Sequence, residues 1–270
     1  MSGGAEVKRC LLSSWLDKDT RKRVIHYLFP QVCMVCGKVL DDGCNSVTKL
    51  GNLGICITCL SKLPIRLPEE RVMDCLSDPY DEDPIPDFQV WSLFHYDMPV
   101  TMLLRRLKFQ NGEYCGEMLG KLMARELERD LPFHPDCVIP IPLSEKRLAS
   151  RGYNQAAVLG GEIAKRLNIP LLEGALVRTR HTRQQSRYVE PGRRMENVAS
   201  AFGVEETWEV EGLKILLIDD ILTSGATLHE AARVLLEQKA GCVLGVTCAS
   251  HRRTSRQKDE KDTKKSTKCH

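Results

Sequence analysis

The apolar residues of this chain follow two kinds of pattern, which alternate along residues 88–249. Short continuous apolar runs, rich in β-branched residues, predict strands buried on both faces. Apolar positions three or four residues apart, between those runs, predict amphipathic helices. The predicted strands are 90–96, 136–143, 215–218 and 243–249, and the predicted helices are 100–109, 114–131, 153–167 and 228–236. Because strands and helices alternate, the pattern predicts an α/β domain with a parallel sheet flanked by helices.

The flanking segments lack this alternation and divide the chain into five parts. Residues 1–30 contain a short amphipathic helix that a proline ends, and residues 31–66 carry closely spaced cysteines. Residues 67–87 are rich in acids and prolines, which predicts an exposed linker before the α/β domain at 88–249. Residues 250–270 have no apolar periodicity, which predicts a disordered basic tail.

The positive charge of the chain is concentrated in that tail. The formal net charge is +3 over 270 residues, but residues 250–270 alone hold eight Lys or Arg and three acids. The rest of the chain therefore has a net charge of about −2, which argues against a basic nucleic-acid-binding body and leaves the tail as the candidate contact. No run of 18 apolar residues exists, and the first 30 residues lack a signal-peptide layout. We therefore expect a cytoplasmic protein without a membrane span.

Four of the twelve cysteines form two closely spaced pairs. Cys33 and Cys36 make one C-x2-C pair, and Cys56 and Cys59 make the other. Two such pairs supply four thiolates, the number that closes a tetrahedral structural zinc site with no open position for chemistry. Four unrelated buried cysteines are the alternative interpretation. The spacing favours a small N-terminal zinc-ribbon module with four cysteine ligands.

The stretch at 214–227 carries the most specific candidate chemistry. Its strand leads to Asp219 and Asp220, then to a hydroxyl-rich turn around Gly225, and then to a helix. Free N–H groups and the dipole at a helix N-terminus favour a phosphate in that turn. The adjacent carboxylates suit ribose hydroxyls or a hydrated Mg²⁺. A helix N-cap with solvated acids is the alternative. The chain contains no G-x-x-x-x-G-K-[ST], which argues against a P-loop nucleotide hydrolase.

Three basic segments are further candidates. A predicted loop with Lys146, Arg147 and Arg151 follows the strand at 136–143, at the edge where α/β sheets bind ligands. A long polar segment, 178–194, holds six arginines and one histidine, which fits a cationic lid over a polyphosphate. A simple surface loop is the alternative for the first segment, and an RNA-binding loop for the second. Lys108, on a predicted helix, is either functional or part of a solvated basic face.

These residues, taken together, resemble a known family. The stretch at 214–227 is similar to the phosphoribosyl-pyrophosphate (PRPP) motif of type I phosphoribosyltransferases. The chain from about residue 28 to 249 resembles the ComF family. The matching residues are Leu28-Phe29-Pro30, both cysteine pairs, Leu107-Lys108-Phe109, Pro140-Ile141-Pro142-Leu143, Arg151-Gly152-Tyr153-Asn154-Gln155, Thr182, Gln185, Arg194, Asn197 and Ala201-Phe202.

The resemblance implies a type I phosphoribosyltransferase fold and assigns roles to individual residues. Asp219 and Asp220 would address the ribose hydroxyls and act as the catalytic carboxylates. The loop of residues 142–151 would face the pyrophosphate with its Mg²⁺, and residues 178–197, Arg183 included, would form a flexible hood. The residues that would hold the 5′-phosphate are Thr223, Ser224, Gly225, Ala226 and Thr227.

Two functions follow from this resemblance. The first is a phosphoribosyltransferase that uses PRPP and an unidentified acceptor. The second is a non-catalytic protein that binds PRPP or a nucleotide and acts through partners in DNA uptake or regulation, since the family is named for competence. A contact between the basic tail and nucleic acid is a further expectation.

Overall fold

The computed structural model describes residues 31–40, 53–73, 85, 88–109, 112–179 and 201–251. The chain forms two compact units, Met1–Ser61 and Lys62–His270. Four predicted parts lie wholly or mostly outside the described residues: the N-terminal helix, most of the acidic linker, residues 180–197 of the hood with Arg183, and the tail from residue 252 on. Within the described residues, no helix is both long and apolar enough to cross a membrane.

The smaller unit is built from two short segments. Residues 31–40 form a tight loop closed by a bridge between Val32 and Val39. The second segment contains helix α3 (Ile57–Leu60), which begins directly after Cys56. Hydrogen bonds from the Met34 amide to the Gly54 carbonyl (3.0 Å) and from the Cys56 amide to the Cys33 sulfur (3.4 Å) join the two segments.

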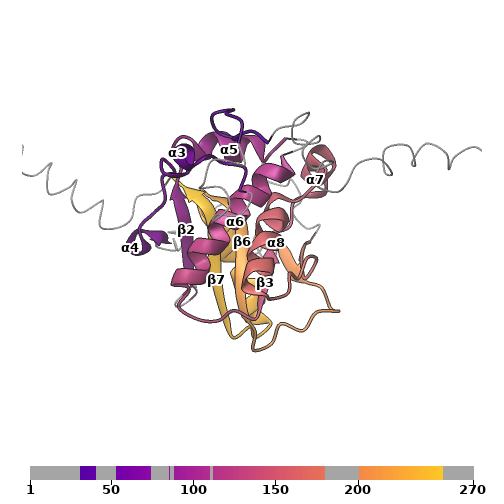
Figure 1. Ribbon diagram of the computed structural model, residues 1–270. Helices are drawn as coiled ribbons and strands as arrows, with labels where there is room; N and C mark the ends of the chain where they lie inside the picture. Colours follow the sequence, from indigo (N-terminus) through magenta and orange to yellow (C-terminus); the bar gives the residue numbers. More distant parts are fainter. Residues whose placement is uncertain are drawn as a thin grey trace, which may run out of the picture. The chain divides into compact units, whose positions relative to one another are not determined.

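A five-stranded sheet forms the centre of the larger unit (Figure 1). Its order is β1 (Val72–Met73), β2 (Gln89–His95), β7 (Cys242–Ser250), β6 (Lys214–Leu222) and β3 (Cys137–Pro140). All neighbouring strands are parallel except β1, which runs antiparallel to β2. The mostly parallel sheet confirms the α/β class that the alternating pattern predicts. The short antiparallel pair β4 (Leu176–Arg178) and β5 (Phe202–Val204) stands apart from this sheet.

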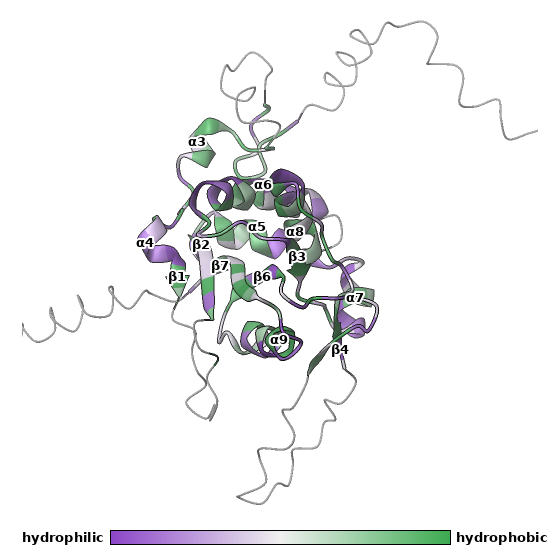
Figure 2. Ribbon diagram, turned by 90° about the horizontal axis from the view of Figure 1, so that it is seen from below, coloured by the Kyte–Doolittle hydropathy of each residue, from purple (hydrophilic) through white to green (hydrophobic). Residues whose placement is uncertain are grey.

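Helices cover both faces of the sheet (Figure 2). On one face lie α5 (Val100–Arg106), α6 (Glu113–Asp130) and α8 (Gln155–Leu167), and on the other lies α9 (Ala226–Glu237). The apolar run of β6 packs against helices on both faces of the sheet. On one face, Ile215 and Leu217 belong to the core cluster that includes the inner residues of α9. Ile218 lies beside Gly160 of α8, which has no side chain to hold the helix away from the sheet. Burial on both faces explains why this strand reads as a continuous apolar run.

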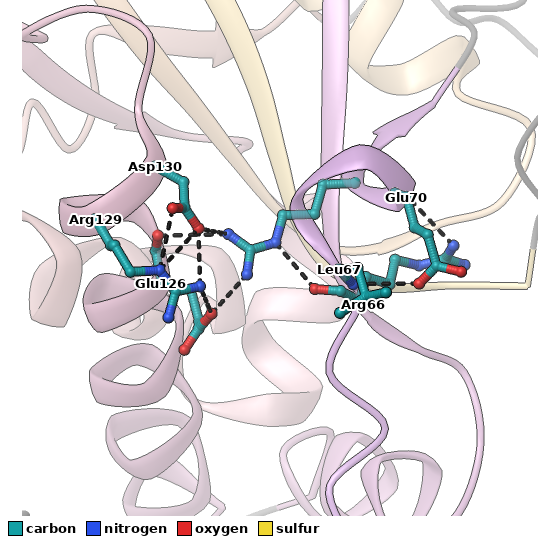
Figure 3. Close-up of polar contacts among 7 residues, drawn as sticks. Arg66, Leu67, Glu70, Glu126, Arg129 and Asp130 are labelled. Carbon is teal, nitrogen blue, oxygen red and sulfur yellow. Dashed lines mark hydrogen bonds and ion pairs between the residues drawn. The ribbon is translucent and has the colours of Figure 1, made fainter.

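Residues 62–73 belong to the larger unit, which corrects the predicted boundaries of the module at 31–66 and of the linker at 67–87. Helix α4 (Pro68–Arg71) and β1 lie against the sheet, and Ile65 forms a bridge with Phe94 of β2. The buried Arg66 donates hydrogen bonds to the carbonyls of Phe94 (3.3 Å) and Ser250 (3.1 Å). The contacts of the buried Arg66 and Arg71 add to this attachment (Figure 3), and an interpretation based on acids and prolines does not predict them.

Candidate ligand-binding site and candidate metal centre

The two aspartates lie within β6, not after its end as the sequence suggested. The strand continues to Leu222 because β7 pairs with it as far as the Leu222–Ser250 match. On its other side, β3 ends at Pro140, opposite Ile218. Beyond that point β6 pairs with β7 alone, so Asp219 and Asp220 stand at an open step in the sheet, at the carboxyl ends of its strands. Ligands of open α/β sheets bind at this edge.

The turn after β6 has the geometry of an anion site. Gly225 has a φ of 87°, a left-handed conformation that favours glycine, and it is the N-cap of α9. The Ser224 hydroxyl accepts a hydrogen bond from the Ala226 amide (3.3 Å), and Thr223 and Thr227 are exposed. The N-terminus of α9, whose first N–H groups have no partner within the helix, therefore lies beside exposed hydroxyl groups. Of the five predicted phosphate-loop residues, Thr223, Ser224 and Gly225 form the turn, and Ala226 and Thr227 begin α9.

The carboxylate pair is held in a definite electrostatic environment. Asp219 Oδ1 accepts a hydrogen bond from the Asp220 amide (2.8 Å), and Lys108 Nζ lies 3.2 Å from Asp220 Oδ2. Burial, and secondly the charge of Asp220, raise the pKa of Asp219 to about 7, although the Asp220 amide and Lys108 oppose the shift. These surroundings therefore favour the neutral form of Asp219, whereas the Lys108 ammonium lies beside Asp220.

Lys108 belongs to this site and not to a solvated basic face. The turn that carries it, just after α5, is fixed by the Tyr153 hydroxyl, which donates to the carbonyl oxygens of Leu107 and, at 3.3 Å, Phe109. Its backbone is thereby tied to the segment between α7 and α8. The sequence showed the motifs that contain Lys108 and Tyr153. It did not show that Tyr153 contacts the turn around Lys108, because the two motifs lie on separate elements.

The basic segment after β3 is a short helix, α7 (Glu145–Arg151), where the sequence suggested a loop. Ser144 is its N-cap, and Gly152, whose φ is 83°, is its C-cap. Lys146 and Arg147 are exposed on it. Periodicity missed this helix because none of its residues is buried, so no apolar face marks it.

Two residues after α7 organise this edge of the site. Gln155 is 1% exposed, and its Oε1 accepts a hydrogen bond from Arg151 Nη1 (2.7 Å), which orients that guanidinium. Asn154 caps α8 through the Ala156 amide (3.1 Å), and its Nδ2 donates to the Ile141 carbonyl (3.0 Å). The predicted pyrophosphate segment is thus anchored to the end of β3. Asn154 and Gln155 lie in the motif 151–155 noted from the sequence, but only the tertiary structure shows which groups they bind.

The raised pKa of Asp219 leads to a prediction about pH and stability. An unfolded aspartate has a pKa of about 3.9. The folded protein therefore binds the extra proton between pH of about 4 and 7, and its stability falls as the pH rises through that window. We expect Asp219→Asn to raise the free energy of unfolding by roughly 1–2 kcal/mol at pH 8 and to have little effect at pH 4.5.

Urea denaturation at both pH values measures this difference. Asparagine retains the Oδ1 acceptor for the Asp220 amide, so the comparison isolates the charge. Glu173→Gln, at an exposed acid in the turn before β4, is the control and should show no such pH-dependent gain. Equal destabilisation of the Asp219 variant at both pH values would contradict the prediction.

The four paired cysteines form the candidate metal centre in the smaller unit. The sulfur atoms of Cys33, Cys36, Cys56 and Cys59 all lie within 4.8 Å of one another, and those of Cys36 and Cys56 are 3.8 Å apart. Zn–S bonds of about 2.3 Å in a tetrahedron place the sulfurs about 3.8 Å apart. The donor set and its spacing therefore fit a structural zinc ion.

The ionisation of these thiols also fits a cation between them. Burial disfavours the Cys33 thiolate, but backbone N–H groups, first that of Cys36, outweigh it and lower the pKa of Cys33 to about 6. Burial, and then the neighbouring thiols, raise the pKa of Cys59 to about 12. Four crowded sulfurs cannot all ionise without a compensating positive charge, which a metal ion supplies.

Comparison with known proteins identifies the class of this chain. Residues 117–270 match the family model described as the phosphoribosyl transferase domain. The chain belongs to this family, in agreement with its parallel sheet and with the position of its candidate site.

Named relatives indicate a smaller group within this family. Competence protein F of Haemophilus influenzae is 34% identical over 146 residues, which cover 52% of this chain and 63% of that protein. DNA utilization protein YhgH of Salmonella typhi is 28% identical over 217 residues, or 78% of this chain and 87% of that protein. These names confirm the resemblance to the ComF family. A solved structure, the glutamine PRPP amidotransferase from B. subtilis, aligns with a TM-score of 0.37 and 21% identity over 50% of this chain and 26% of that one.

Proposed function

We propose that this protein binds PRPP and transfers its phosphoribosyl group to an acceptor. The observation that carries the proposal is the sequence of features along one segment. β6 presents Asp219 and Asp220 at the open step of the sheet, and the glycine-capped N-terminus of α9 follows within five residues. A ribose held at the carboxylates would place its 5′-phosphate in the 223–227 turn and its anomeric carbon toward α7.

The surrounding charges suit the chemistry of pyrophosphate displacement. As the bond between the anomeric carbon and pyrophosphate breaks, positive charge develops on the ribose ring, and the Asp219–Asp220 pair would stabilise it. Lys146, Arg147 and Arg151, on or at the end of α7, would attract the departing polyanion. The location of Asp219, Asp220 and α7 near the carboxyl ends of β6 and β3 supports this proposal.

A magnesium ion fits this proposal. Asp220 is 17% exposed, so a hydrated cation can reach its carboxylate, although the Lys108 ammonium 3.2 Å away offsets part of the negative charge. Carboxylate oxygens are also the protein ligands that Mg²⁺ prefers. When bound with pyrophosphate, Mg²⁺ supplies neutralisation of the negative charge on the leaving group.

Calorimetric titration with PRPP in the presence of Mg²⁺ tests the proposal. The double variant Asp219→Asn/Asp220→Asn should bind PRPP at least about tenfold more weakly than the native protein, or about 1.4 kcal/mol, because the ribose-facing carboxylate pair is lost. Urea denaturation of the double variant, which also loses the Lys108–Asp220 ion pair, checks that weaker binding does not reflect unfolding. Pyrophosphate release on addition of nucleobases or amines then tests for transfer.

The matched control removes two charges elsewhere. Glu205→Gln/Glu206→Gln alters two adjacent exposed acids just after β5 and should leave PRPP affinity unchanged. Native protein that fails to bind PRPP would overturn the proposal. Binding without pyrophosphate release for any acceptor would instead favour a protein that senses PRPP.

Biological context enters the proposal through the relatives. Two of them are named for competence and for DNA utilization. We propose that this protein also acts in DNA uptake or utilization, with PRPP as its small-molecule partner. A contact between nucleic acid and the basic tail remains part of this proposal, and the tail beyond residue 251 lies outside the described residues.

A further inference from the structure

Lys108 lies in a turn whose backbone is fixed by neighbouring groups. The carbonyl oxygens of Leu107 and Phe109, which flank it, accept hydrogen bonds from the Tyr153 hydroxyl, the second at 3.3 Å. The Gly112 amide also donates to the Phe109 carbonyl (3.0 Å). A side chain at Gly112 would collide with the Tyr153 hydroxyl, so the glycine permits this close packing. The backbone of Lys108 is therefore held in place by contacts that need no ligand.

The side chain of Lys108 extends from this turn to the carboxylate pair. Its Nζ lies 3.2 Å from Asp220 Oδ2, and the side chains of Lys108 and Asp220 are 34% and 17% exposed. Burial raises the pKa of Asp219, and the charge of Lys108 opposes that shift, so the ammonium acts on both carboxyl groups. Partial desolvation makes such a pair stronger than an ion pair that is fully exposed to water.

This ammonium disfavours the binding of a bare divalent cation at the same carboxylate. Two adjacent carboxylates would by themselves attract Mg²⁺, which binds carboxylate oxygens at about 2.0–2.1 Å. With Lys108 3.2 Å from Asp220, one negative charge is already compensated, and the ammonium repels a second cation. A bare Mg²⁺ must therefore either displace Lys108 or bind against its charge.

The same ammonium has the opposite effect on a metal that arrives with a polyphosphate. The combined negative charge of the 5′-phosphate and diphosphate groups of PRPP exceeds the positive charge of one Mg²⁺. The complex of PRPP with Mg²⁺ is therefore an anion, and Lys108 attracts it. One side chain can thus discriminate between a bare metal ion and a metal–polyphosphate complex.

We propose that Lys108, held by Tyr153 and Gly112, keeps divalent metal ions away from Asp220 in the free protein, so that the metal enters with its polyphosphate ligand. Lys108 acts through Asp220 and is therefore a positioning residue. The part of this inference that concerns PRPP rests on the proposed function. The part that concerns the bare metal ion rests only on the ion pair between Lys108 and Asp220.

Calorimetric titration of the zinc-loaded full chain with Mn²⁺, which prefers the same oxygen ligands as Mg²⁺, tests the bare-metal part without PRPP. Lys108→Met should raise the Mn²⁺ affinity about tenfold or more, and Lys108→Met/Asp220→Asn should lose this gain. Lys108→Arg keeps the charge and should change the affinity by less than about threefold. Tyr153→Phe, which releases the turn, should give a smaller gain. Lys121→Met is the control, because Lys121 pairs with Glu117 on α6, away from the carboxylate pair.

Titration with PRPP at saturating Mg²⁺ tests the other part. Lys108→Met should weaken PRPP binding about threefold or more, because an attractive charge is lost, whereas the same variant strengthens Mn²⁺ binding. Opposite changes in the two affinities distinguish a charge that selects the complex from a side chain that only supports the fold. A merely structural role would weaken both.

The outcomes separate this inference from the proposed function. An Mn²⁺ affinity that is unchanged or lower in Lys108→Met would overturn the inference, as would a gain that persists when Asp220 is also replaced. An equal gain in Lys108→Arg would show that charge is not the cause. Native protein that fails to bind PRPP would overturn the proposed function, while the Mn²⁺ titration would still decide whether Lys108 excludes the bare metal ion.

Discussion

Replacing Cys59 with serine is expected to remove the metal from the smaller unit and to unfold residues 31–61. Cys59 is 8% exposed and is one of four sulfurs within 4.8 Å of one another. A serine oxygen is a poor substitute for a thiolate ligand of zinc. In small structural sites the binding free energy of zinc is folding free energy, about 10 kcal/mol or more, so its loss exceeds what a unit of this size can withstand.

The small size of this unit makes the metal decisive. Its buried apolar residues within the described part of the chain are Cys33, Leu40, Leu53, Ile55 and Cys59, and two of these are themselves candidate metal ligands. So few residues cannot form a self-sufficient core, which is why small domains of this kind depend on metals or disulfides. The hydrogen bonds that join the two cysteine segments are expected to open when the metal is lost.

Elemental analysis and hydrogen exchange together measure this effect. The native protein should contain about one zinc ion per chain, and Cys59→Ser close to none. Amides of residues 31–40 and 53–61 should lose their protection in the variant. Cys242→Ser, at a half-buried cysteine of β7 outside the cluster, should retain both metal and protection. Full zinc content in Cys59→Ser would show that the cluster is not the metal site.

Replacing Arg71 with methionine is expected to destabilise the larger unit by about 3 kcal/mol. Arg71 is 1% exposed, and its guanidinium forms ion pairs with Glu126 and Asp130 of α6, both at 2.5 Å (Figure 3). Its Nε also donates to the Arg66 carbonyl (3.2 Å). The variant would leave two acids without their buried partner and would release the segment that carries α4 and β1 from α6.

Arg129 provides a matched control for this prediction. It contacts the same two acids, Glu126 and Asp130, but is 59% exposed. Exposed ion pairs contribute about 0–1 kcal/mol, so Arg129→Met should cost much less than Arg71→Met. Urea denaturation of both variants gives the difference in unfolding free energy. Equal losses would mean that burial adds nothing to the Arg71 pairs.

The sequence pattern predicted the helices and strands around the sheet correctly, because each of them is one continuous stretch of residues. The predicted helix at 114–131 is α6, Glu113–Asp130, and the predicted strand at 243–249 lies within β7, Cys242–Ser250. Buried strands and amphipathic helices record their burial in a few consecutive residues. The turn at 223–227 was likewise visible, since its hydroxyls and glycine follow one another in the chain.

Elements attached by polar contacts could not be predicted in this way. Residues 62–73 were assigned to other parts of the chain because Arg66 and Arg71, two arginines, attach them to the sheet and to α6. Helix α7 has no buried face, so no apolar period marks it. The far end of β6 is a strand only because β7 pairs with it, which a four-residue apolar run does not record.

The sequence by itself determined the α/β class, the cysteine pairs and the strand–turn–helix segment of the candidate site, because each depends on residues close together in the chain. Only the tertiary structure decided which charges meet. It brought Lys108 to Asp220 and anchored Arg178 beside the end of β3. Such contacts join residues from different elements, and their energies depend on distance and desolvation, which no local pattern of residue types encodes.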